Sequence, residues 1–172
     1  MPTLVTTPGS ASANAYVTEA EVTTVADALH PNATAWGDAS LNEQRRAILT
    51  ATRLLDQERY VGGRVDAVQA LEFPRSGAPK RPPGTLYLTT EIPEPVKRAC
   101  ARLAIWLVQQ GDTEDPFAPD ELAAFREIRF GSELTISGAG ASIPAGARFL
   151  AQVIRPILAD LLLPAQVRVI RG

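Results

Sequence analysis

The chain has very little of the chemistry on which most enzymes and metal sites depend. Its 172 residues include one cysteine, Cys100, and one histidine, His30. A single cysteine excludes an internal disulfide and a multi-cysteine metal site. A histidine acting as a general base needs a nucleophile and an orienting group nearby. His30 instead precedes Pro31 at an expected helix end, where it can interact with the last carbonyl groups.

Other candidates for chemistry are equally few. Cys100 falls on the apolar stripe of an expected helix, where a small buried hydrophobe is the simplest role. The acidic residues Asp112, Glu114 and Asp115 have no histidine partner, and the glycines between 138 and 146 lack the lysine and serine of a P-loop. We therefore predict that the protein is not an enzyme and has no cofactor or metal site.

Long apolar runs and targeting signals are missing as well. No stretch approaches the roughly 20 apolar residues that cross a bilayer, so we expect no membrane partner. The first residues, MPTLVTTPGSASANA, have neither a basic nor an apolar region of a secretory signal. These features fit synthesis in a reducing cytoplasm.

Charge is low in sum but uneven along the chain. The net charge is −2, aromatic residues are 6% of the chain, and they are not interleaved with the arginines, so no base-stacking platform is visible. Residues 1–44 carry five acidic residues and no lysine or arginine, whereas residues 146–172 carry four arginines and one aspartate. Opposite charge at opposite ends suits head-to-tail contacts between subunits, but accidental asymmetry of the surface explains it equally well.

Helix signals dominate the chain. Capping boxes at Thr18/Glu21 and Ser40/Glu43 open two helices, of which the second is clearly amphipathic. Prolines predict a third helix over residues 94–110, closed by Gly111. Further helical patterns cover residues 119–130 and 147–161, and Pro156 should kink or split the last one. Residues 132–137 and 167–170 alternate like short strands.

These elements predict a mainly α fold, a small helical bundle with a short β element near 132–137. A flexible N-terminal arm spans residues 1–15, the helical domain 16–163 and a strand-like C-terminal arm 164–172. Residues 62–92 form a long Pro/Gly-rich loop, which usually has a function or leans on another subunit. The end of the third helix, residues 103–108, is apolar all round. It is either the centre of the domain or covered by a neighbouring subunit.

An ordered set of motifs gives the chain a family resemblance. The motifs are residues 14–20 (NAYVTEA), 51–56 (ATRLLD), 63–64 (GR), 73–77 (FPRSG) and 92–99 (IPEPVKRA). In this order they resemble the head–tail adaptor (connector, or head-completion) proteins of tailed bacteriophages, a family often labelled DnaT-like single-stranded-DNA binding. The sequence departs from the pattern at Phe73, where tryptophan is more usual.

The resemblance implies a structural virion protein at the neck, made in the host cytoplasm. It implies a homo-oligomeric ring, usually a dodecamer, beneath the portal protein, with a stopper or tail-completion protein docked below. Double-stranded DNA would pass through the ring during genome ejection without sequence-specific contact. The alternative is a single-stranded-DNA-binding protein in phage replication, which predicts a basic stripe and stacking aromatics.

Residue roles follow from the pattern and the resemblance together. Phe73 and Pro74 are expected to anchor the long loop, and Arg75 to pair with a carboxylate or helix carbonyls within the subunit or across an interface. Ile105, Trp106 and Val108 are expected near a subunit interface. The free C-terminal strand pattern suits addition to a sheet edge of the portal, with docking residues Val167, Arg168, Val169, Ile170 and Arg171.

Overall fold

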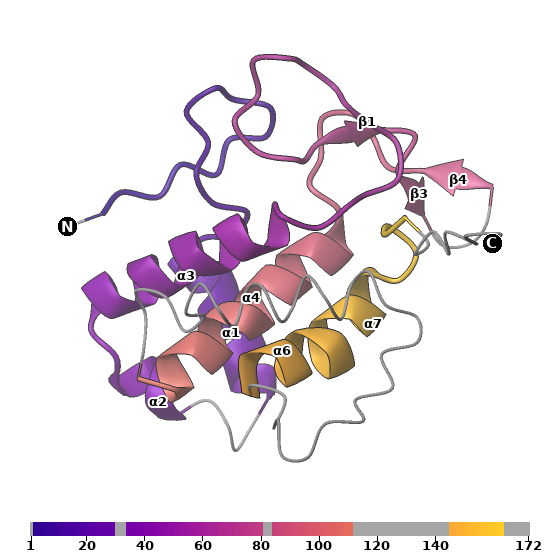
Figure 1. Ribbon diagram of the computed structural model, residues 1–172. Coiled ribbons are helices and arrows are strands. Elements are labelled where there is room, and N and C mark those ends of the chain that lie inside the picture. Colours follow the sequence, from indigo (N-terminus) through magenta and orange to yellow (C-terminus); the bar gives the residue numbers. More distant parts are fainter. Residues whose placement is uncertain (1, 30–33, 81–83, 112–144, 164–172) are drawn as a thin grey trace, which may run out of the picture.

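The protein is mainly helical, and its described residues also form two very small sheets. The computed structural model describes residues 2–29, 34–80, 84–111 and 145–163. In chain order these contain α1 (Glu19–Ala28), α2 (Thr34–Asp38), α3 (Leu41–Leu55), β1 (Gly63–Arg64), β2 (Arg75–Ser76), β3 (Pro79–Lys80), β4 (Thr85–Leu86), α4 (Glu94–Gln109), α6 (Ala145–Phe149), the π-helix η1 (Leu150–Ile154) and α7 (Arg155–Leu158). Helices form the lower layer in Figure 1, and the loops and sheets lie above one end of it.

Both predicted capping boxes are present. The Glu21 amide donates to Thr18 Oγ1 at 3.3 Å, and the Thr18 amide donates to Glu21 Oε2 at 2.8 Å. The Ser40–Glu43 pair repeats both bonds at 3.3 and 2.8 Å. Each box satisfies two amides that the first turn of a helix leaves without a partner, which fixes the starts of α1 and α3.

Helix α4 is the centre of the domain. It contacts α1, α2, α3, η1 and α7, and Leu103, Ile105 and Leu107 are buried. Leu103, Ile105 and Leu107 of the apolar end are therefore covered by the chain's own helices, whereas Trp106 and Val108 are half-buried. Because Ile105 is only 3% exposed, it does not lie on a surface that a second subunit could contact.

The last helical segment is split before Pro156. The Arg155 amide donates to Leu150 O, five residues back, so the turn ahead of the proline has π geometry. Proline has no amide hydrogen and its ring crowds the preceding turn. The chain resumes as α7, which packs on α4.

The long loop is held by short strand pairs. Strand β1 pairs antiparallel with β2 and β3 with β4, so the Leu86 segment has its partner in Pro79–Lys80. Gly62 has φ +79°, and a Cβ there would lie 2.0 Å from the Ser76 carbonyl oxygen. Only glycine allows the loop to close this tightly.

The N-terminal segment lies against the domain in place of the expected flexible arm. Ala13 and Ala15 are buried, and the Asn14 side chain accepts from the Val5 amide at 2.8 Å and donates to Thr3 O at 2.9 Å. The predicted helix over 119–130, the strand at 132–137 and the C-terminal arm at 164–172 lie outside the described residues, as does His30. Among the described residues, no helix has both the length and the apolarity that a membrane crossing requires.

Candidate nucleic-acid interface

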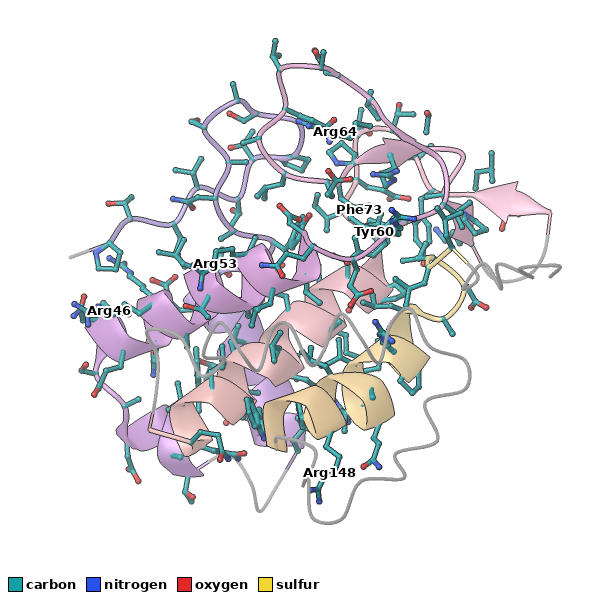
Figure 2. The ribbon with its side chains drawn as sticks, viewed as in Figure 1. Arg46, Arg53, Tyr60, Arg64, Phe73 and Arg148 are labelled. Carbon is teal, nitrogen blue, oxygen red and sulfur yellow. The ribbon has the colours of Figure 1, made fainter. Side chains whose placement is uncertain are left out.

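Three aromatic rings tie the loop to the helices. Phe73 is 1% exposed, and its ring meets Tyr16 and Tyr60 edge to face, with centroids 6.2 and 4.7 Å away. Figure 2 shows Tyr60 and Phe73 together between the helices and the loop. We call Tyr16, Tyr60, Phe73 and Arg75 the aromatic junction. The Phe73–Pro74 peptide bond within it is cis, and Phe73 anchors the loop as its position in the sequence predicts.

Arg75 completes the junction as a buried scaffold residue. Its guanidinium donates to the backbone oxygens of Val61 at 3.0 Å, Tyr60 at 3.3 Å and Gly62 at 2.6 Å, and it forms an ion pair with the Glu72 carboxylate. A planar guanidinium with several donors suits a turn of clustered carbonyls. Arg75 therefore acts within the subunit, and its side chain is not available to a phosphate group.

A half-buried carboxyl group connects the junction to α3. Asp56 follows the helix and accepts a hydrogen bond from the Tyr16 hydroxyl group and one from the Glu72 amide at 3.4 Å. Burial raises the pKa of Asp56 from 3.8 to about 6, while the hydrogen bonds and the nearby Arg64 guanidinium act in the opposite direction. The loop residue Arg64 is thus held close to the end of α3.

Exposed arginines lie on several elements. Among the described residues they are Arg46, Arg53, Arg59, Arg64, Arg98 and Arg148. Arg46 and Arg53 are seven residues apart on α3, two helical turns or about 10 Å along the same face. In Figure 2 both extend from α3, Arg64 lies on the loop above its end, and Arg148 extends from α6 at the lower side. We call Arg46, Arg53 and Arg64 the arginine row.

A cleft of about 630 Å³ opens where the N-terminal segment, the start of α1, the β3–β4 hairpin and the start of α4 meet. Both lysines of the chain, Lys80 and Lys97, line it together with Tyr87. The Lys80 ammonium lies 5.1 Å from the centroid of the Tyr87 ring. Lys97 Nζ is 2.8 Å from Glu21 Oε1. The cleft thus combines a partly accessible aromatic ring with two lysines and three glutamates, Glu21, Glu91 and Glu94.

The other candidate functional residues of the sequence that the structure describes lie outside the aromatic junction and the cleft. Trp106 is half-buried and stacks on Phe149 at a centroid distance of 5.0 Å, and Val108 is half-buried on the same helix. Cys100 lies in the core, where burial raises the pKa of its thiol from 9.0 to about 12, as expected of an unreactive cysteine. The docking residues Val167, Arg168, Val169, Ile170 and Arg171 lie outside the described part. Within that part, no three His, Cys, Asp or Glu side chains come together as metal ligands.

One protein-family model matches the chain over residues 1–172, and its description is "Putative DnaT-like ssDNA binding protein". No curated protein and no solved structure matches the chain. The match covers the whole chain, and the family's description favours the second of the two functions that the motifs left open.

The interpretation as a phage head–tail adaptor is wrong, because the matching family is described by single-stranded-DNA binding. Several expectations depended on that interpretation and are wrong with it. They are the structural virion function, the dodecameric ring, the portal and stopper partners and the double-stranded DNA channel. The alternative, a single-stranded-DNA-binding protein, is what the finding supports. Tyr16, Phe73 and Arg75, which belong to the motifs, are buried in the structure.

The sequence gives only weak signals of the exposed sites. Arg46 and Arg53 mark the polar side of an amphipathic helix, which is an ordinary solvated face in most proteins. Tyr87 and Lys80 are seven residues apart in a proline-rich loop. Only the β3–β4 pairing brings Lys80 and Tyr87 to the same cleft. The small number of lysines and tyrosines in the sequence was the one feature that could have drawn attention to these two residues.

Proposed function

We propose that this chain, which belongs to the family of DnaT-like single-stranded-DNA-binding proteins, binds single-stranded DNA. The family match over residues 1–172 is the observation that supports the proposal most directly. Such binding requires cations that follow the phosphate backbone and rings on which bases stack. The arginine row offers the first, and Tyr87 in the cleft offers the second.

The arginine row is suited to backbone contact without sequence readout. Arg46 and Arg53 share one face of α3, and the aromatic junction holds the loop that carries Arg64 near the end of that helix. Guanidinium groups bind phosphate oxygens through paired donors. Since the net charge of the protein is −2, attraction must come from this local surface and not from the molecule as a whole.

Salt dependence tests the proposal. For single strands, log K falls with log[salt] with a slope of about −0.7 per phosphate contact. Three arginine contacts predict a slope of about −2 for a fluorescein-labelled 15-mer in fluorescence anisotropy. The double variant Arg46→Gln/Arg53→Gln should bind more weakly and reduce the slope by about 1.4.

Arg148→Gln is the matched control, because Arg148 is an exposed arginine on a different side of the molecule. It should leave the affinity and the salt slope unchanged. Absence of binding at 50 mM salt by the unaltered protein would overturn the proposed function. An equal loss in the double variant and in Arg148→Gln would show that the contact is not localised on α3.

A further inference from the structure

The cleft beside Tyr87 has the size and lining of a binding site for a small planar group. Its volume of about 630 Å³ lies in the range of roughly 300–1,000 Å³ that is typical of small-molecule pockets. Lys80 of β3 and the turn that follows β4 form one wall, and the first turn of α4 forms another. A single nucleotide fits such a space, whereas a folded partner does not.

Tyr87 supplies a positioned aromatic face. Its backbone amide donates to Ala78 O at 2.9 Å, and part of its ring packs against the core while the rest stays accessible. The ammonium group of Lys80 already lies over this ring, which shows that the face is open to a group that seeks π-electron density. Because Lys80 is exposed on a long flexible stem, it can move aside and still reach a phosphate.

Two carboxylates give the cleft a polar edge beside that ring. Glu91 accepts from the Leu88 amide through Oε1 at 3.0 Å, and Glu91 and Glu94 both line the cleft. Both carboxylates lie close enough to raise the pKa of Tyr87 after the larger effect of burial. Glu21 also lines the cleft, but its carboxylate is engaged by Lys97 and by the capping box.

Carboxylates discriminate between bases by the donors that a base presents. They accept from exocyclic amino groups such as N4 of cytosine and N6 of adenine. Thymine has carbonyl oxygens in place of these groups, and their lone pairs face the negative oxygens unfavourably. The cleft should therefore discriminate between two pyrimidines of nearly equal size.

We propose that the cleft binds one nucleobase of single-stranded DNA, stacked on Tyr87 with its exocyclic amino group toward Glu91 and Glu94 and its phosphate near Lys80 and Lys97. This inference rests on the proposed function and adds a base preference to it. The protein binds deoxycytidine-containing strands in preference to deoxythymidine-containing ones. The arginine row contributes affinity that is independent of base.

The first experiment measures the affinity of the full chain for dC15 and dT15 by anisotropy. The unaltered protein should bind dC15 more tightly, by about fivefold or more, which is the lower end of the discrimination that one base contact gives. Tyr87→Leu, which keeps apolar packing but removes the ring face, should weaken binding of dC15 by about fivefold or more, as loss of a stacked base does. Tyr87→Phe should stay within about twofold, because phenylalanine offers the same π-face.

The second variant separates base choice from stacking. Glu91→Gln/Glu94→Gln should lower the affinity for dC15, leave that for dT15 unchanged or improved, and so abolish the preference. Circular dichroism and thermal melting of each variant confirm that it is folded. Both glutamates are at least partly exposed, so this double substitution leaves the core untouched.

The third experiment distinguishes failure of the inference from failure of the proposed function. Titration of dCMP into Arg46→Gln/Arg53→Gln, followed through the Tyr87 ring signals by NMR, reports on the cleft alone. Shifts with dCMP that exceed those with dTMP support the site. Suppose that oligonucleotides bind and that the arginine substitutions weaken this binding, but that Tyr87→Leu and Glu91→Gln/Glu94→Gln leave the affinity and the base preference unchanged. The cleft proposal is then overturned and the proposed function stands. If the unaltered protein binds no oligonucleotide, both are overturned.

Discussion

Replacement of Arg75 by methionine tests the role of the aromatic junction directly. The change keeps an unbranched apolar stem of similar length and removes the guanidinium group. The backbone oxygens of Tyr60, Val61 and Gly62 and the carboxylate of Glu72 then lose their donors. The loop between α3 and β1 would keep its covalent path but lose what fixes its turn.

The size of the effect follows from burial. Arg75 is 8% exposed, and removing one partner of a buried, hydrogen-bonded charge typically costs about 3–5 kcal/mol. We expect that loss in the free energy of unfolding, which corresponds to a fall in Tm of about 6–20 °C for a chain of this length. Arg75→Lys should cost about half as much, because a single ammonium group cannot reach all of the carbonyls at once.

Urea denaturation, followed by the fluorescence of Trp36 and Trp106, measures the loss. Glu72→Gln is the control that removes the ion pair and keeps the carbonyl contacts. Its carboxylate side chain is 30% exposed, so the expected loss is about 1 kcal/mol or less. The reasoning is refuted if Arg75→Met costs less than about 1 kcal/mol, or if Glu72→Gln is as damaging as Arg75→Met.

Two further changes test the same region. Phe73→Ala should lower the free energy of unfolding by about 3–5 kcal/mol in urea denaturation, because it leaves a cavity and removes two edge-to-face contacts. Phe73→Leu should cost less than half of that. Equal losses in the two variants would contradict a role for the aromatic ring. Asp56 has a raised pKa, about 6 against 3.8, so the folded state binds the proton more tightly and the stability due to this group is lost as pH rises from about 4 to 6. Relative to the unaltered protein, Asp56→Asn should therefore gain on the order of 3 kcal/mol between pH 4 and pH 7; a stability difference that does not change with pH would exclude this titration.

The starts of α1 and α3 were predictable because their determinants are local. Thr18 and Glu21 lie within one turn, as do Ser40 and Glu43, and the capping bonds form between neighbours in sequence. Pro156 acts on the turn immediately before it. Such interactions require no knowledge of the rest of the chain, so pattern and spacing suffice.

Short strands carried no comparable signal. A strand of two residues has no periodicity, and the pairing of β3 with β4 depends on where the loop is anchored. That anchor is the junction, in which Tyr16 meets Phe73 from 57 positions farther along the chain. The loop's path, and with it the cleft beside Tyr87, is a consequence of tertiary packing.

The sequence by itself determined the helical class, the starts of α1, α3 and α4, and the anchoring role of Phe73. Tertiary structure decided that Leu103, Ile105 and Leu107 at the apolar end of α4 lie in the core of the domain, because only the arrangement of the neighbouring helices shows which side chains they cover. It also decided which polar residues share a surface. Buried motif residues are constrained by contacts that a sequence pattern can reveal, whereas Arg46, Arg53 and Tyr87 gain their significance from exposure and proximity, which arise only when the chain has folded.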